Sequence, residues 1–181
     1  NATTLAIVDG RGLSGPLLSV SANGESIVHA TSTVAVGGTS LGSNTTLSFT
    51  LANSGSTQLH VQSIEIDGRN AADFTIVTAP AASIAPSGST TFVVRFTPSA
   101  SGTRAATLHI ISDDVYDSPF DFFITGSCTA PELVLEQPAG TELLQGTASA
   151  SFGTIKLGAA TTLNFIVKNK GTADLTGLAA S

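Results

Sequence analysis

Histidine is the first residue type that could carry chemistry, because the chain has three: His29, His60 and His109. His60 and His109 both occupy outward positions of segments with alternating polarity. If those segments are neighbours in one sheet, the two imidazoles lie side by side. A metal site needs about three or four ligands with a supporting shell, and the sequence offers no third ligand. We therefore expect a solvated histidine pair and no metal-binding residues.

Carboxylates cluster in the segment SDDVYDSP, residues 112–119, which contains Asp113, Asp114 and Asp117. Clustered carboxylates can hold calcium, which prefers many oxygen ligands, but the EF-hand spacing is absent. Asp, Ser and Pro are also the residues that satisfy backbone groups in tight loops. We interpret the segment as a hairpin loop, with calcium binding as the alternative.

Motifs for nucleophilic or phosphate chemistry are missing from the sequence. It has no G-x-S-x-G elbow and no glycine-rich phosphate loop after a strand. Glu65 and Asp67 stand two apart on one predicted strand and face solvent, whereas a glycosidase needs two carboxylates across a cleft. We predict that the chain is not an enzyme, that it has no catalytic or cofactor-binding residues, and that it uses no cofactor.

Two asparagines and one cysteine could be modified. The tripeptides that begin at Asn1 and Asn44 match the N-glycosylation sequon, although a Thr-rich chain produces such matches by chance. The sequence leaves open whether either is glycosylated. Cys128 is the single cysteine, so no disulfide can form within the chain. We interpret it as a small buried thiol, with an interchain disulfide as the alternative.

Composition excludes several partners. The 181 residues include 13 acidic and seven basic ones, for a net charge of −6. Nucleic acid and anionic membrane surfaces both require clustered cations, so neither is an expected partner. No apolar run is long enough to span a bilayer. Abundant Ser, Thr, Gly and Ala with few Lys and no Met favour an extracellular or cell-surface location.

The elements that position these residues are strands, because apolar and polar residues alternate along most of the chain. Phe49 and Leu51 show this period, as do Phe92, Val94 and Phe96. With turn signals between the runs, the sequence predicts strands at 17–21, 26–36 in pieces, 45–52, 58–66, 73–78, 90–97, 103–112 and 119–126. NAADF, residues 70–74, could form one helical turn. So many short antiparallel strands predict an all-β sandwich, with a core of Phe49, Leu51, Phe92, Val94, Phe96, Leu108 and Ile110.

The chain also repeats itself. TTLSFTLANSGSTQL, from Thr45, recurs as TTLNFIVKNKGTADL, from Thr161, at an offset of 116 residues. In both copies an asparagine that is read as a turn residue, Asn53 or Asn169, stands two before a glycine. The alignment extends upstream without a gap and places residues 16–26 over 132–142. A self-similarity of this length predicts tandem repeats.

The repeats predict three segments. Residues 1–14 are the closing strand of a preceding repeat, 15–130 a complete repeat, and 131–181 the opening half of a following one. SCTAPEL, residues 127–133, is the expected linker. We expect Leu163, Phe165 and Val167 to be exposed on an incomplete sheet. Either the chain is an excerpt of a longer array, or another subunit completes the sheet.

Together, FTLANSGSTQLHVQSIEIDGRNAADFTIV, GSTTFVVRFTPSASG and the closing ITG resemble a bacterial choice-of-anchor D repeat, of the Hydin-like (ASH) group of immunoglobulin-like domains. The resemblance covers residues 15–130, and its first half recurs to the end of the chain. It implies an immunoglobulin-like antiparallel β-sandwich, usually in tandem within long secreted or surface-anchored bacterial proteins. It implies no catalytic residues. The chain departs from the pattern at Cys128, where a glycine or another small residue is expected.

These observations favour a non-catalytic structural or adhesive module that acts as a spacer or fibre segment. Its expected partners are neighbouring repeats or copies of itself, and its surface ligand is not identified. One alternative is a subunit of an extracellular filament completed by strand donation between chains, with Asn1–Ser14 as the donor. Another is a ligand-binding accessory domain of a larger secreted enzyme, and a third is an intracellular scaffold. A single Tyr and no Trp disfavour sugar binding, and the low Lys content disfavours the scaffold.

Overall fold

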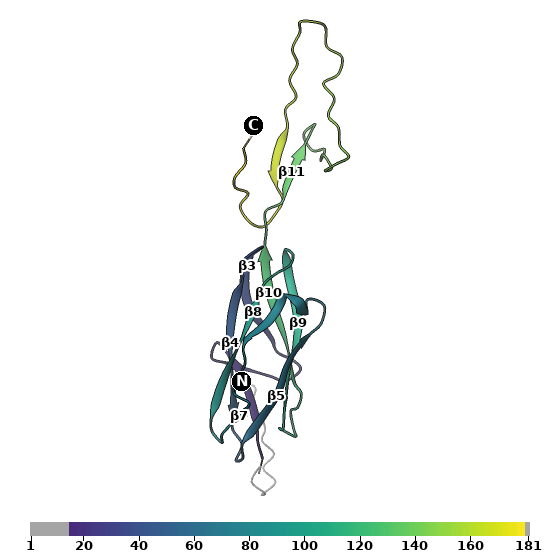
Figure 1. The fold of residues 1–181 in the computed structure, drawn as a ribbon. Helices are drawn as coiled ribbons and strands as arrows, with labels where there is room; N and C mark the ends of the chain where they lie inside the picture. The colour runs from purple at the N-terminus through teal and green to yellow at the C-terminus, as the bar shows by residue number, and fades with distance from the viewer. Residues whose placement is uncertain (1–14, 180–181) are drawn as a thin grey trace. The chain divides into compact units, whose positions relative to one another are not determined.

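The structure is a computed structural model that describes residues 15–179 (Figure 1). The predicted closing strand Asn1–Ser14 lies outside the described residues. The chain divides into two compact units, Asn1–Cys128 and Thr129–Ser181. They are called unit 1 and unit 2 below and are described separately.

Unit 1 consists of two five-stranded sheets (Figure 1). The first has the order β2 (Glu25–Ile27), β1 (Leu18–Ala22), β4 (Thr45–Asn53), β8 (Ser89–Phe96) and β6 (Phe74–Thr78). The second has the order β3 (Thr33–Ser40), β10 (Phe120–Thr129), β9 (Gly102–Ser112), β5 (Leu59–Asp67) and β7 (Ser83–Ile84). Neighbouring strands pair antiparallel throughout the registers of β1, β4, β8, β5, β9 and β10. The predicted all-β sandwich is confirmed.

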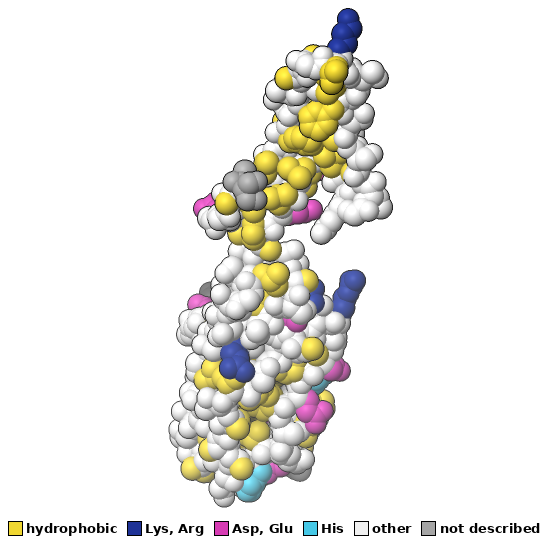
Figure 2. Space-filling model, turned by 45° about the horizontal axis from the view of Figure 1, so that its top comes forward, with side chains coloured by type: hydrophobic (Ala, Val, Ile, Leu, Met, Phe, Trp, Pro, Cys, Tyr) yellow, Lys and Arg dark blue, Asp and Glu magenta, His cyan; other side chains and the backbone are white. Residues whose placement is uncertain are grey.

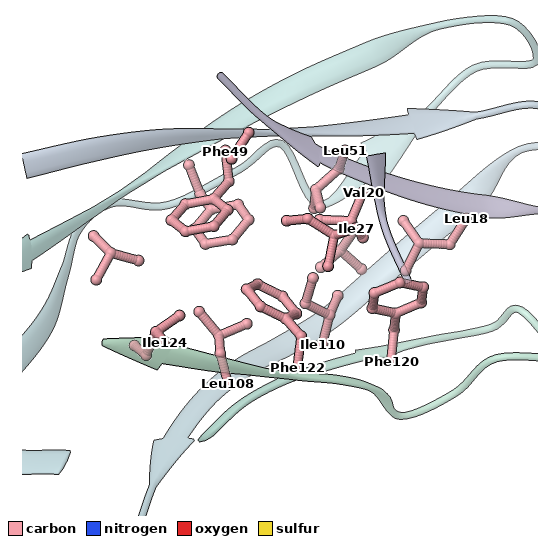
Figure 3. Packing of buried hydrophobic residues seen from close by; sticks show 14 of the residues in the cluster. Leu18, Val20, Ile27, Phe49, Leu51, Leu108, Ile110, Phe120, Phe122 and Ile124 are labelled. Atoms are coloured by element: carbon pink, nitrogen blue, oxygen red, sulfur yellow. The ribbon is translucent and has the colours of Figure 1, made fainter. Parts of the chain in front are cut away.

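The core lies between the two sheets, because each strand turns its apolar residues to one side. Figure 3 shows Phe49 and Leu51 from the first sheet directed toward Leu108 and Phe122 from the second. Phe49 pairs with Phe92 in the β4–β8 register, and their stacked rings lie 4.9 Å apart between centroids. All seven predicted core residues are fully buried: Phe49, Leu51, Phe92, Val94, Phe96, Leu108 and Ile110. The predicted strand phase is therefore confirmed.

The strands differ from the predicted ones at β3, β10 and β7. β3 runs on to Ser40, past the predicted end at residue 36. β10 runs on to Thr129, because Gly126 and Cys128 continue the inward positions of the strand. Ser127–Thr129 therefore belong to a strand, and the predicted linker of seven residues is wrong. The two-residue strand β7 has no predicted counterpart, since two residues are too few to show a period. The helical turn predicted within NAADF is confirmed as the 3-10 helix η1 (Ala71–Asp73).

Unit 2 has two strands, β11 (Leu133–Glu136) and β12 (Ile166–Asn169), which pair antiparallel with Leu135 opposite Val167. This pair corresponds to β1 and β4 of unit 1, where Val20 lies opposite Leu51. Among residues 130–179, no other segment forms a strand.

The registers of the two units correct the sequence alignment. Leu133 lies opposite Asn169 just as Leu18 lies opposite Asn53. Pro131 therefore takes the place of Pro16, one residue earlier than an ungapped alignment requires. The offset between the repeats is therefore 115 residues at β11 and 116 residues at β12. The segment between β11 and β12 contains one more residue than the segment between β1 and β4, so the ungapped alignment is wrong for β11.

Between residues 15 and 179 the helical structure is limited to the short η1. No helix in this range has the length and apolar character needed to cross a membrane.

Candidate functional site

The outer face of the second sheet carries a cluster of charged and titratable groups around His109. β9 places His109 directly opposite Asp121 on β10 and Glu65 on β5. His109 Nδ1 lies 2.8 Å from Asp121 Oδ1, and Nε2 lies 3.2 Å from Asp67 Oδ1. The imidazole therefore lies between two carboxylates. Its side chain is 26% exposed, so the group lies at the surface.

This arrangement favours a protonated imidazole. The hydrogen bond to Asp121 raises the pKa of His109 above its ordinary value, partial burial opposes the rise, and Asp67 adds to it. The backbone N–H of Asp121 in turn donates to His29 Nδ1 at 3.1 Å. The His29 ring meets Phe120 edge-on at 5.4 Å between centroids. The cluster thus ties β9, β10 and β5 to the loop before β3.

His60 is not part of this cluster, so the predicted side-by-side histidine pair is wrong. Strands β5 and β9 are neighbours, as the prediction requires. However, the antiparallel register brings Glu65 opposite His109 and leaves His60 at the far end of β5. There His60 Nδ1 lies 3.0 Å from Asp113 Oδ2. Two outward residues on neighbouring strands meet only if the register aligns them.

Aspartates of the loop between β9 and β10 bind backbone and histidine groups. Asp113 Oδ1 accepts a hydrogen bond from the N–H of His60 at 2.8 Å. Asp114 is fully buried and accepts from the N–H of Leu18 at 2.7 Å and of Tyr116 at 2.9 Å. Because Asp113 and Asp114 serve different strands, the geometry agrees with a structural loop. Within residues 15–179 no group of three or more His, Cys, Asp or Glu side chains is arranged to hold a metal ion.

A buried ion pair anchors η1. Arg104 Nε on β9 donates to Asp73 Oδ2 at 2.5 Å, and the N–H of Ser99 donates to Asp73 Oδ1 at 3.2 Å. Burial by itself raises the pKa of Asp73, but the bonds from Arg104 and Ser99 outweigh it and hold the pKa below its ordinary value. The pair joins segments that are far apart in sequence, and it presents no free carboxylate for catalysis.

Asn53 forms a clamp at the end of β4. Its Oδ1 accepts from the N–H groups of Leu17 and Gly55 at 3.2 and 2.9 Å. Its Nδ2 donates to the carbonyls of Thr57 and Ile84 at 2.8 and 3.0 Å. A Cβ at Gly55 would collide with the backbone of residues 15–17, which explains the glycine two residues after the asparagine.

Asn169 forms the corresponding clamp in unit 2. Its Oδ1 accepts from the N–H groups of Glu132 and Gly171 at 3.1 and 3.0 Å, and its Nδ2 donates to the carbonyl of Ala173 at 2.7 Å. The N–H of Thr172 donates to the carbonyl of Ala130 at 2.8 Å, as Ser56 does to Gly15 in unit 1. A Cβ at Gly171 would collide with residues 130–132 in the same way. The repeated sequence motif therefore produces the same local structure twice.

Three further candidate residues and one surface groove complete the description of unit 1. Cys128 is 3% exposed, as predicted for a buried thiol. Asn44 is exposed in the turn between β3 and β4, while Asn1 lies outside the described residues. A shallow apolar groove runs along β5 and the segment between β6 and β7, lined by Val61, Ile64, Ile76, Pro80 and Ala82.

Unit 2 carries the largest group of exposed apolar side chains. Leu133, Leu135, Phe165 and Val167 are 37–48% exposed. Figure 2 shows hydrophobic side chains gathered along one side of this unit. The predicted exposure of Phe165 and Val167 is confirmed, whereas Leu163 is half-buried.

Sequence reasoning missed Asp121 and the Asp73–Arg104 pair. Asp121 could have been found, because a hairpin centred on Val115 pairs residue 121 with residue 109. Asp73 and Arg104 meet only through the folding of η1 onto β9, and no sequence spacing indicates that contact.

The two packed antiparallel sheets, with the residue before β1 bound to the end of β4, form an immunoglobulin-like β-sandwich. The chain belongs to the HYDIN/CFA65/VesB-like family of Ig-like domains, whose model matches residues 27–126, more than half of the chain. No curated protein matches the chain.

Solved structures resemble the chain at low sequence identity. A protein of unknown function from Porphyromonas gingivalis W83 is 17% identical with a TM-score of 0.50, over 64% of this chain and 48% of that one. The secreted serine protease VesC from Vibrio cholerae is 14% identical with a TM-score of 0.43, over 54% of this chain and 22% of that one. An ASH/PapD-like domain of human CEP192 is 14% identical with a TM-score of 0.43, over 64% and 87%. The chain thus spans about half of the first of these proteins.

Proposed function

We propose that the chain is a non-catalytic segment of a secreted or cell-surface protein, in which successive immunoglobulin-like modules serve as spacer or fibre. The observation that carries this proposal is the recurrence of the asparagine clamp. In both units its Oδ1 accepts from the residue just before the first strand and from the glycine two residues after the asparagine. We take the clamp around Asn169 as support for a second module of the same kind that begins in unit 2. A succession of such modules separates the functions at the two ends of a long protein.

The use of polar groups within the sandwich supports a non-catalytic role. Asp73, Asp114 and Asn53, the most deeply buried polar side chains of unit 1, all bind backbone or an arginine within the sandwich. Such groups stabilise a fold but leave no reactive group aimed at a substrate. Within the family, the choice-of-anchor D repeats are the subgroup that we assign, on the motifs quoted above.

Location tests this proposal. In the cells that produce it, the intact protein should be found at the cell surface or in the medium. Protease added to whole cells should therefore remove the surface-bound protein. A protein retained in the cytosol and protected from external protease would overturn the extracellular assignment and favour an intracellular scaffold.

A second candidate function is a ligand-binding accessory domain of a larger secreted enzyme. One observation favours it: Val115 and Tyr116 are 83% and 68% exposed in the loop between β9 and β10, where they could contact a ligand. A glycan array with the wild-type chain and a Tyr116→Ala variant is the test. Binding that the substitution abolishes would support this candidate, and no binding to any glycan would remove carbohydrate as the ligand.

A further inference from the structure

The three histidines of unit 1 differ in the kind of group that faces their Nδ1 atoms. His60 and His109 face the carboxylates of Asp113 and Asp121. An ionised carboxylate can only accept, so the ring donates in both contacts. His29 instead faces the backbone N–H of Asp121, at 3.1 Å. A backbone N–H can only donate, so Nδ1 of His29 accepts and the ring is neutral, with its proton on Nε2.

This bond is one half of a reciprocal pair between strand β10 and residues 28–32, called the β2–β3 loop below. The N–H of Ala30 donates to the carbonyl of Asp121 at 2.7 Å, while the N–H of Asp121 donates to His29. Two residues further along β10, the N–H of Phe123 donates to the carbonyl of Ser32 at 2.9 Å. The His29 ring therefore takes the place that a backbone carbonyl has in a regular antiparallel pair.

The β2–β3 loop is also strained at the same point. Ala30 has a φ of +57°, in the left-handed region that residues with a Cβ rarely occupy. A conformation of this kind persists only where surrounding contacts impose it. Ala30 donates one of the two bonds to Asp121, and its neighbour His29 accepts the other. These two bonds therefore help to hold the loop in its strained form.

The His29 ring covers an edge of the core. It meets the ring of Phe120 at an interplanar angle of 74°, with 5.4 Å between the centroids. Phe120 is 4% exposed and belongs to the core cluster, in which Figure 3 labels it. His29 itself is half-buried, so water can reach its ring. If the ring moved away, Phe120 would lose its cover on this side.

Charged groups on the surrounding elements leave the His29 ring with a polar but uncharged partner. On β10 the carboxylate of Asp121 is bound to His109 of β9, which in turn contacts Asp67 of β5. The remainder of the β2–β3 loop and all of β3 are uncharged, and β2 contributes Glu25, which is exposed. The group that Nδ1 of His29 faces is thus the Asp121 amide, and a proton added at Nδ1 would point at the proton of that amide.

We propose that the β2–β3 loop is an acid-released flap, in which protonation of His29 breaks its bond to the Asp121 amide, frees residues 28–32 from β10 and uncovers Phe120. A protonated ring carries N–H groups at both nitrogens and cannot accept. The stability that this bond provides is therefore present while His29 is neutral. It is lost as the pH falls below about 6, where histidine side chains generally gain their proton.

Release should be confined to this loop. In the contacts of His60 and His109 the ring donates to a carboxylate, so an added proton leaves those bonds in place. Acid therefore acts in opposite directions on contacts of the same sheet, and β9 and β10 stay paired while the loop opens. The proposal goes beyond a spacer function and does not depend on it.

Amide hydrogen exchange of the 181-residue chain, followed by NMR at about pH 7.5 and about pH 5, tests the proposal. Protection factors correct for the pH dependence of intrinsic exchange. The protection of the Ala30 and Asp121 amides should fall by about tenfold or more on acidification, because each loses a bond of the reciprocal pair. The amides of β4 and β8 should keep their protection, which shows that the sandwich remains folded.

His29→Asn is the informative variant, because its side-chain carbonyl can accept near the position of Nδ1 but does not titrate. It should keep the loop protected at both pH values. His60→Asn removes a histidine from another contact and is the matched control, which should still show acid release. His29→Ala lacks an acceptor and should show low loop protection at both pH values.

Three results would overturn the proposal. The first is wild-type loop protection that does not change between the two pH values. The second is an equal loss of protection in wild type and His29→Asn, which would mean that another group responds to acid. The third is a loss of protection at pH 5 that extends equally to β4 and β8, because unit 1 would then unfold as a whole.

Discussion

Phe96 illustrates how single residues determine the packing of unit 1. It is fully buried at the end of β8, and its ring stacks on Phe74 at 5.0 Å between centroids. On the facing sheet, a Cβ at Gly126 would lie 2.5 Å from the Phe96 ring, so the ring occupies the space that a larger residue would need. A large and a small residue on opposite sheets are therefore matched to each other.

Phe96→Ala should lower the free energy of unfolding of unit 1 by about 3–5 kcal/mol, because it leaves a cavity beside Gly126 and Phe74. Urea denaturation followed by circular dichroism measures this loss. A loss below about 1 kcal/mol would be typical of a surface position and would contradict the packing described here.

His109 should make the stability of unit 1 depend on pH. Its pKa in the folded chain is raised above the ordinary value of 6.5 that we take for the unfolded chain. The extra stability is therefore fully present below about pH 6.5 and is lost as the pH rises through the raised native value. The free energy of unfolding of wild type minus that of His109→Gln should be larger at about pH 5.5 than at about pH 8.5.

Asp121→Asn provides the control for this prediction, because it removes the carboxylate that contributes most to the raised pKa. The pH dependence attributable to His109 should become smaller in that variant. A difference between wild type and His109→Gln that stays constant, or that grows toward high pH, would show that the Asp121 and Asp67 contacts do not stabilise the protonated imidazole.

At the scale of elements, an asparagine in each unit binds the residue that precedes the first strand. Asn53 satisfies four backbone groups from three segments, and it is 1% exposed. Asn169 has three corresponding bonds but is exposed. Because water replaces lost hydrogen bonds only at an exposed site, the same substitution should have different effects in the two units.

Asn53→Ala should lower the stability of unit 1 by about 3 kcal/mol, because it leaves buried N–H and carbonyl groups without partners. Asn169→Ala, the matched change in unit 2, should cost less than about 1 kcal/mol in local stability. Residue-resolved hydrogen exchange can follow both units in one sample. Equal effects at the two sites would mean that burial of the Asn53 clamp does not matter.

At the scale of the whole molecule, the two units differ in how much of their backbone is in strands. Residues 137–165 of unit 2 contain no strand, whereas most of unit 1 is paired. Segments with few paired backbone groups open more readily. Lys156 lies exposed in this stretch, while Arg95 and Arg104 lie within β8 and β9.

Limited trypsin digestion should therefore cut after Lys156 well before it cuts after Arg95 or Arg104. Mass spectrometry of early fragments identifies the order. If cuts at Arg95 or Arg104 appear first, the sandwich of unit 1 is less stable than the open part of unit 2, and the division of stability argued here is wrong.

The sequence by itself determined most of the strands, their phase and the recurrence of an asparagine two residues before a glycine. Alternating polarity and turn residues are local signals, so Phe49 or Phe96 could be placed in the core without knowledge of their neighbours in space. The same holds for η1 and for the exposure of Phe165 and Val167, which follow from short motifs and their repetition.

Only the tertiary structure decided which outward residues meet. Antiparallel register put His109 with Asp121 and Asp67 rather than with His60, and the fold of η1 onto β9 brought Asp73 to Arg104. The tertiary structure also showed that Pro131 occupies the position equivalent to Pro16, which the ungapped alignment does not predict. Register depends on the summed bonds and packing of whole strands, and a shift of one residue changes every pair. Local sequence patterns do not report the total energy of pairing two strands, and so they could not determine the register.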